Sequence, residues 1–463
     1  MNADGFFESE TIVAIATPPG RGALGVVRLS GPDALRLTEK IYRARSVGWP
    51  KPHTAFLGEI FCPSTGATID QAVVCCYRGP QSYSGEDLVE ITCHGSPVVL
   101  RQILNLLVRL GARVAKPGEF TMRAFLHGKI DLTQAEAIHD LISAETEYQT
   151  RIAIQQVQGS LAKAIEPSKS ALIDLIVQLE TAVEFTDEQL VEVDRNRIKT
   201  TIRDICERLR QLVRSFDSGR VIREGVRLTI VGKPNVGKSS LFNLLLSENR
   251  AIVTEVPGTT RDTLVETISL DGVPFRLVDT AGVHATTDPV ELIGIERTQL
   301  EIADADVVVL MFDTSRPFDR DDQDLIQATS SARRLMVINK IDADSRWFKN
   351  GRGMPGELKN LTKISVRTGQ GIPELKEAVI RIGINREKLG IEDAIITNVR
   401  HHNLLDLATA ELERAGKALS DGMSEEVLLS SMHQALRHLG ELTGETTVED
   451  ILQNIFSTFC VGK

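Results

Sequence analysis

The sequence has few of the features that mark a secreted or membrane-inserted chain. Its six cysteines include no Cys-x-x-Cys pair, and Cys75 and Cys76 are neighbours in a strand-like stretch, where successive side chains point to opposite faces. Its longest apolar runs, such as residues 307–312, are far too short to cross a bilayer. Residues 1–10 lack the basic start and apolar stretch of a secretory signal. We therefore expect a cytoplasmic protein with no membrane contact and no disulfide or metal framework built on cysteine.

Broad positive charge is also absent. The net charge is −10 and the pI is near 5.5, which opposes the basic footprint of a protein that holds nucleic acid by itself. Contact with RNA would need a local basic patch or a basic partner. Four arginines on one helical stretch alternate with acidic residues, which favours a solvated surface over an RNA-binding face: Arg203, Arg208, Arg210 and Arg214.

The length and the patterning predict several domains. A chain of 463 residues has room for two to four domains, at roughly 100–200 residues per domain. Residues 1–126 combine short β-rich runs with one clear helix at 97–110, which predicts an α+β domain. Helical periodicity then prevails in residues 127–222, where Thr133 and Glu136 have the spacing of a capping box.

The second half of the chain changes character twice. Strands and helices alternate in residues 223–385, which predicts a doubly wound α/β domain. Helical periodicity returns in residues 386–463. We therefore predict a multidomain α/β chain in which the doubly wound domain is inserted into an all-α domain built from both flanks.

A phosphate-binding motif opens the doubly wound domain. Residues 232–239 read Gly-Lys-Pro-Asn-Val-Gly-Lys-Ser and fit the pattern GxxxxGK[ST]. They follow an apolar strand and precede a helix, which is the context that the pattern requires. Backbone N–H groups and the helix N-terminus would surround the phosphates, Lys238 would reach the β and γ phosphates, and Ser239 would supply an oxygen to Mg²⁺.

Two further motifs follow in the order that a GTP site requires. Residues 279–282 (Asp-Thr-Ala-Gly) end a strand, so that Asp279 approaches the metal and the Gly282 N–H contacts the γ-phosphate. Residues 339–342 (Asn-Lys-Ile-Asp) close a later strand. The Asp342 carboxylate can accept both N–H groups of guanine, a donor pair that adenine lacks. The three motifs together predict GTP rather than ATP.

Other parts of the predicted site depart from the common pattern. Residues 365–367 (Ser-Val-Arg) stand where a base-contacting Ser-Ala-Lys loop is usual. Val283 takes the place of the glutamine that orients the attacking water in Ras-like proteins, and no arginine finger can be assigned. Three nearby acids are open candidates for orienting water, although each could equally be a solvated charge: Asp288, Glu291 and Glu296.

Four stretches make the whole chain resemble the MnmE (TrmE) family of tRNA modification GTPases. They are residues 17–22 (Thr-Pro-Pro-Gly-Arg-Gly), 117–129 running into 131–137, 258–262 (Gly-Thr-Thr-Arg-Asp) and 460–463 (Cys-Val-Gly-Lys). His127 departs from the asparagine that is common in the second stretch. The resemblance implies a Ras-like P-loop GTPase domain inserted in a helical domain, after an α+β domain that binds folate and dimerises.

The resemblance also implies the function and the partners. A homodimer would join an MnmG-type partner, which carries FAD, in a heterotetramer. The assembly would use GTP hydrolysis and a tetrahydrofolate one-carbon donor to add a carboxymethylaminomethyl or aminomethyl group at C5 of the wobble uridine of certain tRNAs.

The resemblance extends to the residues of the GTP site. Glu291 would orient the attacking water, and Thr260 would join Ser239 on Mg²⁺. Potassium would replace an arginine finger, with Asn235, Thr254, the Val256 carbonyl and Thr259 as its ligands. The motifs and the resemblance together predict these GTP contacts: Asn235, Val236, Gly237, Lys238, Ser239, Ser240, Thr254, Glu255, Val256, Pro257, Gly258, Thr259, Thr260, Asp279, Thr280, Ala281, Gly282, Asn339, Lys340, Asp342, Ser365, Val366 and Arg367.

A second implied site binds 5-formyl- or 5,10-methylene-tetrahydrofolate through Arg28, Glu90, Lys129 and Lys463. The Glu90 carboxylate can pair with pterin N–H groups, while the cations suit the folate carboxylates or the formyl oxygen. The family places Cys460 near the modification site, either as a catalytic group or as a packing residue. A lipidated cysteine is the other interpretation, but the terminal lysine and the lack of a preceding polybasic run disfavour it.

Two other functions stay open. A GTPase switch in RNA binding or ribosome assembly would use the same GTP site without modification chemistry, but it would be expected to carry an RNA module such as a KH fold. Folate-dependent aminomethyl transfer in amino-acid catabolism would explain the N-terminal domain and leave the GTP motifs unused.

Overall fold

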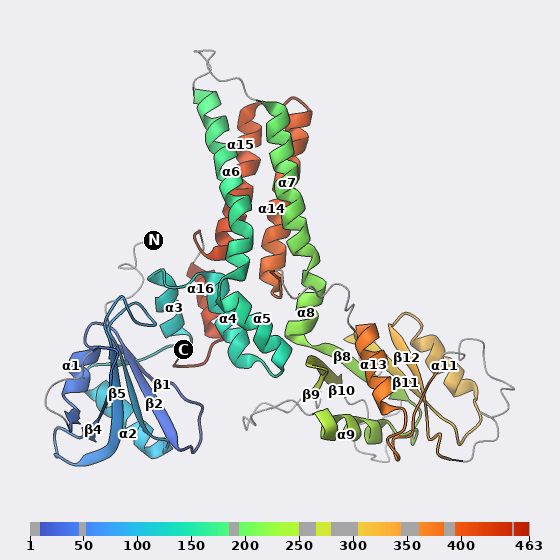
Figure 1. Ribbon diagram of the computed structural model, residues 1–463, viewed down its shortest axis with the longest axis horizontal. Coiled ribbons are helices and arrows are strands. Elements are labelled where there is room, and N and C mark those ends of the chain that lie inside the picture. Colours follow the sequence, from blue (N-terminus) through green and yellow to red (C-terminus); the bar gives the residue numbers. More distant parts are fainter. Residues whose placement is uncertain are drawn as a thin grey trace. The chain divides into compact units, whose positions relative to one another are not determined.

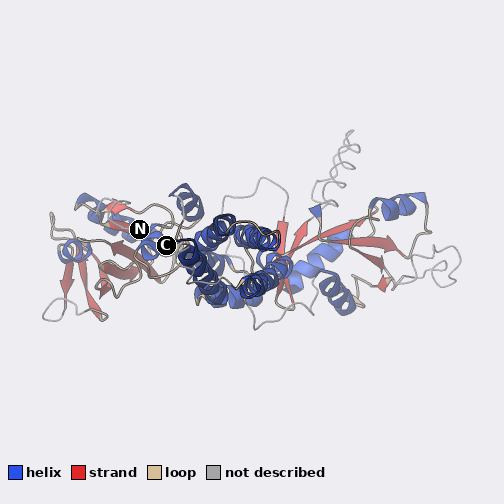
Figure 2. Cartoon of the chain, turned by 90° about the horizontal axis from the view of Figure 1, so that it is seen from above, coloured by secondary structure: helices blue, strands red, loops and turns tan. Residues whose placement is uncertain are grey.

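The computed structural model describes residues 10–45, 52–184, 194–249, 265–278, 304–343, 361–383, 394–446 and 449–462. The chain divides into two compact units, of which the first comprises Met1–His139, Val157–Ala162 and Leu439–Lys463, and the second comprises Asp140–Gln156 and Lys163–His438. Figure 2 shows the described strands gathered into two separate sheets. No helix in the described ranges is long and apolar enough to cross a membrane.

The first unit contains a seven-stranded sheet in the order β3-β4-β5-β6-β2-β1-β7 (Figure 1). All its pairings are antiparallel except that of β1 with β7. Its strands are β1 (Ile12–Ile15), β2 (Leu24–Ser30), β3 (Tyr42–Ala44), β4 (Ala55–Phe61), β5 (Thr68–Tyr77), β6 (Leu88–His94) and β7 (Arg113–Val114). Helices α1 (Ala34–Glu39) and α2 (Pro97–Arg109) share one apolar core with the sheet.

The predicted α+β character of this region is therefore confirmed. Alternating burial explains why β5 was predictable, since Cys76 is buried while Cys75 is half-buried on the opposite face. All six cysteines are free. The predictions did not include β4 or the short elements α1, β3 and β7, and these last three carry too few residues for a period to be recognised.

The C-terminal end of the chain packs within the first unit. Helix α16 (Glu449–Ser457) contacts α3 (Glu119–Leu126), and Leu452 and Phe456 share a core with Met122. The Gly118 N–H donates to the Cys460 carbonyl over 3.3 Å. A residue with a side chain could not replace Gly118 without strain, because its φ is +66° and a Cβ would lie 2.7 Å from the Phe456 oxygen.

Helix α4 (Leu132–Ser143) begins with a different capping box from the predicted one. The prediction used Thr133 and Glu136, but both residues lie inside the helix. Asp131 is the N-cap, since its Oδ1 accepts from the Gln134 N–H over 2.9 Å, and Gln134 Oε1 accepts from the Asp131 N–H over 3.0 Å. The helix thus starts earlier because aspartate and glutamine form the reciprocal pair.

The second unit contains long helices from both sides of its sheet domain. These are α6 (Ser160–Glu184), α7 (Arg195–Arg214), α8 (Phe216–Glu224), α14 (Val399–Ser420) and most of α15 (Glu425–Thr443), with α5 (Glu147–Val157) before them. Figure 1 shows α7 running beside α14, and Gly416 of α14 lies next to Ile202 of α7. Arg203, Arg210 and Arg214 pair with acidic side chains on this surface. The α/β domain is therefore inserted between helices that pack on one another.

The inserted domain contains a six-stranded sheet in the order β13-β12-β11-β8-β10-β9, parallel except for the β10–β9 pair. Its strands are β8 (Val226–Gly232), β9 (Val265–Leu270), β10 (Val273–Val278), β11 (Val307–Asp313), β12 (Arg334–Asn339) and β13 (Thr362–Lys363). Helices α9 (Lys238–Asn249) and α13 (Ile372–Gly383) cover one face, and α11 (Arg320–Ala328) covers the other. This arrangement confirms the predicted doubly wound fold, although the antiparallel strand β9 was not predicted.

Candidate functional site: a guanine-nucleotide pocket

The P-loop crosses the carboxyl end of β8 and leads into α9. Lys238 is the first residue of α9, and its Nζ donates to the carbonyls of Gly232 and Lys233 over 2.8 and 3.0 Å. The ammonium is thereby held over the loop whose N–H groups would surround a phosphate. Gly237 permits the turn, since its φ is +104°.

The motif at the end of β12 meets the P-loop directly. Because β8, β11 and β12 are parallel neighbours, their carboxyl ends lie at one edge of the sheet. The Asn339 Nδ2 donates to the Val236 carbonyl over 2.9 Å, and Asn339 Oδ1 accepts from the Val366 N–H over 3.1 Å. Asn339 therefore ties the P-loop to the loop after β13. Its own main-chain carbonyl accepts from the Thr314 N–H over 3.1 Å.

Lys340 makes a second connection to the P-loop. Its Nζ donates to the Asn235 carbonyl over 2.8 Å and to Asp313 Oδ2 over 2.6 Å. Both Lys340 and Asn235 have positive φ angles, 64° and 65°, so two residues in a costly backbone conformation hold one another in place. Burial alone would raise the pKa of Asp313, but the hydrogen bonds from Lys340 and Ser315 lower it below its ordinary value.

Asp313 was not among the predicted site residues. The signal was present, since an aspartate and a threonine directly follow the apolar run of β11 at the sheet edge where the other motifs end. Polar residues at the carboxyl ends of parallel strands are candidates for a site even without a motif.

Asp342 lies where a guanine base would be read. Its Oδ1 accepts from the Ser365 hydroxyl over 2.6 Å, and its Oδ2 lies 2.6 Å from the Arg367 guanidinium. The Ser365 hydrogen bond, and then the charge of Arg367, lower the pKa of Asp342, so the carboxylate is ionised and accepts hydrogen bonds at neutral pH. The divergent Ser-Val-Arg loop therefore still lies beside the carboxylate that is predicted to bind guanine.

These loops line an open pocket of about 900 Å³ beside α9. Its walls combine the P-loop and α9 with the motif after β12 and the loop after β13: Gly237, Ser240, Asn243, Leu244, Ser247, Asn339, Lys340, Asp342, Ala343, Val366 and Arg367. The volume lies within the range of small-molecule sites. Ten of the predicted GTP contacts thus line one cavity or bond to the residues that line it: Asn235, Val236, Gly237, Ser240, Asn339, Lys340, Asp342, Ser365, Val366 and Arg367.

A second group of predicted nucleotide residues lies outside the described ranges. It includes the water-orienting Glu291, the magnesium ligand Thr260 and three of the four potassium ligands. The whole group is Thr254, Glu255, Val256, Pro257, Gly258, Thr259, Thr260, Asp279, Thr280, Ala281, Gly282 and Glu291. Their roles stay predictions.

The predicted folate residues lie on the first unit. Arg28 on β2 and Glu90 on β6 are cross-strand partners, and the Arg28 guanidinium donates to Glu90 Oε1 over 2.7 and 3.0 Å. Arg28 Nη1 also lies 3.4 Å from the Gly462 carbonyl, so the C-terminal end reaches this pair. The rings of Tyr83 and Phe120 lie 5.5 and 5.7 Å from the guanidinium carbon.

The other members of that group are less closely connected. The Lys129 Nζ donates to the Pro80 carbonyl over 2.9 Å on an exposed loop, and Lys463 lies outside the described residues. The Cys460 side chain is exposed. The His127 ring contacts the main chain of Ser84, so the residue that departs from the family motif helps to hold the adjacent loop.

Comparison with known proteins assigns the family. Residues 11–129 match the family described as the GTP-binding protein TrmE N-terminus, and residues 132–460 match the MnmE helical domain. The tRNA modification GTPase MnmE of Koribacter versatilis is 44% identical, and the match covers 100% of both chains. That of Thermotoga maritima is 42% identical over 98% of this chain and 100% of its own.

A solved structure also resembles part of the chain. Aquifex aeolicus Era bound to GDP and AlF4⁻ is 26% identical and covers 41% of this chain and 66% of Era, with a TM-score of 0.28. The family matches span most of the chain, and the relatives match it from end to end. The chain therefore belongs to the MnmE (TrmE) family of tRNA modification GTPases.

Proposed function

We propose that this chain hydrolyses GTP and, together with an MnmG-type flavoprotein, adds a carboxymethylaminomethyl or aminomethyl group to C5 of the wobble uridine of certain tRNAs. The observation that carries the GTP part is the interlocked pocket in which Asn339 joins the P-loop to the loop that contacts Asp342. Membership of a tRNA modification family supports the tRNA part.

Nucleotide binding follows from three groups in the pocket. The Lys238 ammonium would move from the Gly232 and Lys233 carbonyls to the phosphates, where it meets full negative charge. Ser239 lies in the first turn of α9 and would provide a hydroxyl ligand to Mg²⁺, which prefers oxygen. Asp342 would accept the N–H pair of guanine, and Arg367 would turn away from the carboxylate.

Hydrolysis would use groups that replace the missing glutamine and arginine finger. Glu291 would orient the attacking water. Asn235, Thr254, the Val256 carbonyl and Thr259 would hold K⁺, which would offset the charge that develops on the phosphates. Asn235 suits this role because its positive φ places it at the turn of the P-loop, where its side chain is exposed.

The folate donor would occupy the Arg28 region of the first unit. Glu90 would pair with pterin N–H groups, and Arg28, Lys129 and Lys463 would contact the negative or carbonyl oxygens of the donor. The half-buried ring of Tyr83 beside Arg28 supports a site for a planar ligand, whereas Phe120 is fully buried and only packs behind the guanidinium. Cys460 would lie near the reacting carbon as a catalytic group.

The proposed assembly is a cytoplasmic homodimer joined through the N-terminal domains and bound to two copies of the partner that carries FAD. A net charge of −10 supports a shared RNA site, since the chain alone lacks a broad basic surface. The domains would comprise residues 1–126, 127–222, 223–385 and 386–463.

Reconstitution tests this function. The purified chain, its FAD-bearing partner, unmodified tRNA, a methylene-tetrahydrofolate donor, an ammonium or glycine source, GTP, Mg²⁺ and K⁺ are combined, and the tRNA nucleosides are analysed by mass spectrometry. We expect no C5-modified uridine to form when GTP, the folate or the partner is omitted. Replacement of K⁺ by Na⁺ and the Glu291→Ala substitution are each expected to slow GTP hydrolysis.

The outcomes separate the alternatives. GTP hydrolysis without any nucleoside change in the complete mixture would favour a GTPase switch in RNA binding or ribosome assembly. If modification proceeded without GTP, the proposed coupling of GTP hydrolysis to tRNA modification would be wrong.

A further inference from the structure

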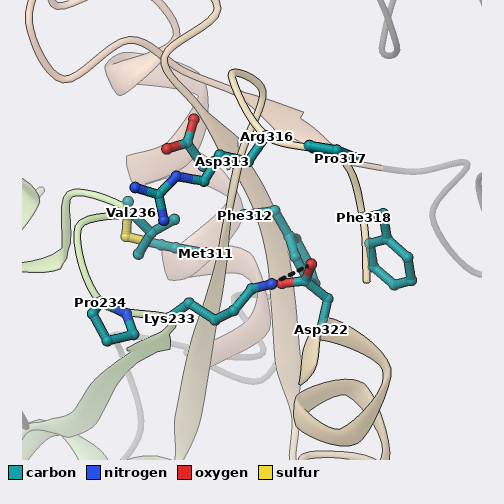
Figure 3. Close-up of a pocket in the computed structure, with 10 residues that line it drawn as sticks. All are labelled: Lys233, Pro234, Val236, Met311, Phe312, Asp313, Arg316, Pro317, Phe318 and Asp322. Atoms are coloured by element: carbon teal, nitrogen blue, oxygen red, sulfur yellow. Dashed lines mark ion pairs between the residues drawn. The ribbon is translucent and has the colours of Figure 1, made fainter. Parts of the chain in front are cut away.

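Lys233 makes a contact that the nucleotide motifs do not require. It is the second residue of the P-loop motif, and its Nζ lies 2.6 Å from Asp319 Oδ1 and 2.8 Å from Asp322 Oδ2. Figure 3 shows its side chain running from the P-loop toward the start of α11, with the ion pair to Asp322 dashed. The contact joins the P-loop to a helix that carries no nucleotide motif.

The two carboxylates are themselves fixed by the backbone of α11. Asp319 is the N-cap and accepts from the N–H groups of Asp321 and Asp322, while Asp322 Oδ2 accepts from the Asp319 N–H over 3.1 Å. This capping box orients both carboxylates independently of their contact with Lys233. The Asp322 side chain is only 9% exposed and that of Lys233 is 26% exposed. The Lys233–Asp322 pair is therefore partly shielded from solvent, unlike a typical surface pair, whereas the Asp319 side chain is 56% exposed.

The contact stabilises the charged forms of Lys233 and Asp319. Burial alone would lower the pKa of the Lys233 ammonium, but the hydrogen bonds to Asp319 and Asp322 raise it above its usual value. The Lys233 hydrogen bond in turn lowers the pKa of Asp319. Lys233 and Asp319 are therefore ionised across the physiological pH range.

Among the described residues, the cavity that adjoins Lys233 is too small for a ligand. The adjoining cavity holds about 20 Å³ and is lined partly by apolar side chains, including Phe312, Pro317 and Phe318. That volume accepts about one water molecule. Lys233 thus forms a contact within the protein and is not an anion-binding group.

Lys233 is connected to the phosphate-binding lysine through its own main chain. Its carbonyl accepts from the Lys238 Nζ over 3.0 Å, and Asn235, two residues later, has a φ of +65°. Asn339 and Lys340 hold the middle of the loop at the Val236 and Asn235 carbonyls. The ion pair with α11 is the contact that fixes the entry of the loop.

We propose that Lys233 is a positioning residue for nucleotide binding, because its ion pair with Asp319 and Asp322 fixes the P-loop entry and thereby the carbonyl that places Lys238. This inference rests on the proposed GTP site. It predicts that the carboxylates of Asp319 and Asp322, whose described contacts with the P-loop are those with Lys233, affect nucleotide affinity.

The test measures binding of a fluorescent GDP analogue and steady-state GTP hydrolysis for the full chain with Lys233→Met, Lys233→Arg, Asp322→Asn and the double variant Lys233→Met/Asp322→Asn. Lys376→Met is the matched control, because Lys376 forms a 2.7 Å ion pair with Glu248 elsewhere in the same domain. We expect Lys233→Met and Asp322→Asn each to raise the dissociation constant and KM about fivefold with kcat changed less than about twofold. Lys233→Arg should restore most of the affinity, and the double variant should match the worse single variant.

Each other outcome overturns the inference. Wild-type affinity in Asp322→Asn together with loss in Lys233→Met would show that Lys233 acts without Asp322. Additive losses in the double variant, or an equal loss in Lys376→Met, would show that the pair does not act as a unit. A wild-type chain that binds no guanine nucleotide would instead remove the proposed function on which the inference rests. Thermal unfolding of every variant shows whether binding is measured on folded protein.

Discussion

Asn339 and Val236 are joined by a 2.9 Å hydrogen bond from the asparagine amide to the P-loop carbonyl. The same amide group accepts from the Val366 N–H over 3.1 Å. One side chain thus fixes the distance between the loop that would hold phosphate and the loop that would flank the base. The predicted phosphate-binding loop and the predicted base-binding loop are therefore joined through the Asn339 side chain in this domain.

Substitution of Asp342 should change the base that is recognised. In Asp342→Asn the side chain offers one acceptor and one donor, so it can no longer accept both N–H groups of guanine. The loss should be about 10- to 150-fold in GTP affinity, since hydrogen bonds to a charged group are worth roughly 1.5–3 kcal/mol. Xanthosine triphosphate, which presents an oxygen in place of the guanine amino group, should bind the variant better than GTP does. Competition binding with both nucleotides checks this, and equal preference for GTP in variant and wild type would contradict it.

Two glycines with positive φ should respond differently to alanine. At Gly237 a Cβ would lie 2.4 Å from the Asn339 Nδ2, whereas at Gly272 it would meet nothing within 4 Å. Both substitutions force a side chain into the left-handed region and should cost about 1 kcal/mol of stability. Gly237→Ala should in addition push Asn339 away from the Val236 carbonyl and weaken nucleotide binding. Unfolding curves and nucleotide titrations of the two variants separate these effects, and equal nucleotide affinity in both would be inconsistent with the steric argument.

The motifs made the nucleotide pocket predictable, but not the contacts that brace it. The strands, the P-loop and the base-reading motif all follow from apolar runs and fixed spacings in the sequence. Asp313 could be proposed from its place at the end of an apolar run, but its contact with Lys340 and the Lys233 ion pair form only when β11 and α11 are placed beside the P-loop. Lys233 and Asp319 lie 86 residues apart along the chain, and Asn235 and Lys340 lie 105 apart, so no local pattern reveals these two contacts.

The helix start at α4 illustrates a different limit. Residues 131–137 contain two possible capping boxes, and the sequence alone does not decide between them. The choice of Asp131 and Gln134 also gives Gln134 a hydrogen bond to the Val157 carbonyl over 2.8 Å. A tertiary contact therefore favours one of two local solutions.

A buried carboxylate in the first unit predicts acid sensitivity. Glu119 is fully buried, and although burial alone would raise its pKa, the hydrogen bonds from Arg113, the Lys116 N–H and Arg123 lower it below the ordinary value of 4.5. Because the folded-state pKa is the lower one, this stabilisation is complete above about pH 4.5 and is lost as the pH falls through the folded-state value. Denaturant unfolding followed between pH 3 and pH 7 should show this loss.

Glu119→Gln tests the assignment. The variant should be less stable at neutral pH by about 3 kcal/mol, because it removes one partner of a buried ion pair. It should also lose less stability than the wild type on acidification. Glu10→Gln is the control, since Glu10 pairs with Arg113 at the surface and should change stability by less than about 1 kcal/mol. A steeper acid dependence in Glu119→Gln than in the wild type would refute the assignment.

The cysteines should differ sharply in reactivity. Hydrogen bonds from Ser64 and Thr65 lower the pKa of Cys62 to about 7, while burial raises that of Cys76, Cys93 and Cys206 to about 11. Since the thiolate is the nucleophile, alkylation of Cys62 should rise with pH through a midpoint near 7 and should be fastest among these four. Peptide mapping after brief iodoacetamide treatment checks this. A Cys62 midpoint above pH 8.5 would be contrary to the expectation.

The measurement that tests the central claim most directly is mass-spectrometric analysis of tRNA nucleosides from cells that carry either the wild-type chain or Asp342→Asn at equal abundance. A deletion strain provides the unmodified reference. We predict that C5-modified wobble uridine is lost in both the variant and the deletion strain, because guanine recognition is needed for the modification. Modified uridine at the wild-type level in the deletion strain would contradict the proposed role in tRNA modification, and the same level in Asp342→Asn alone would contradict its dependence on GTP.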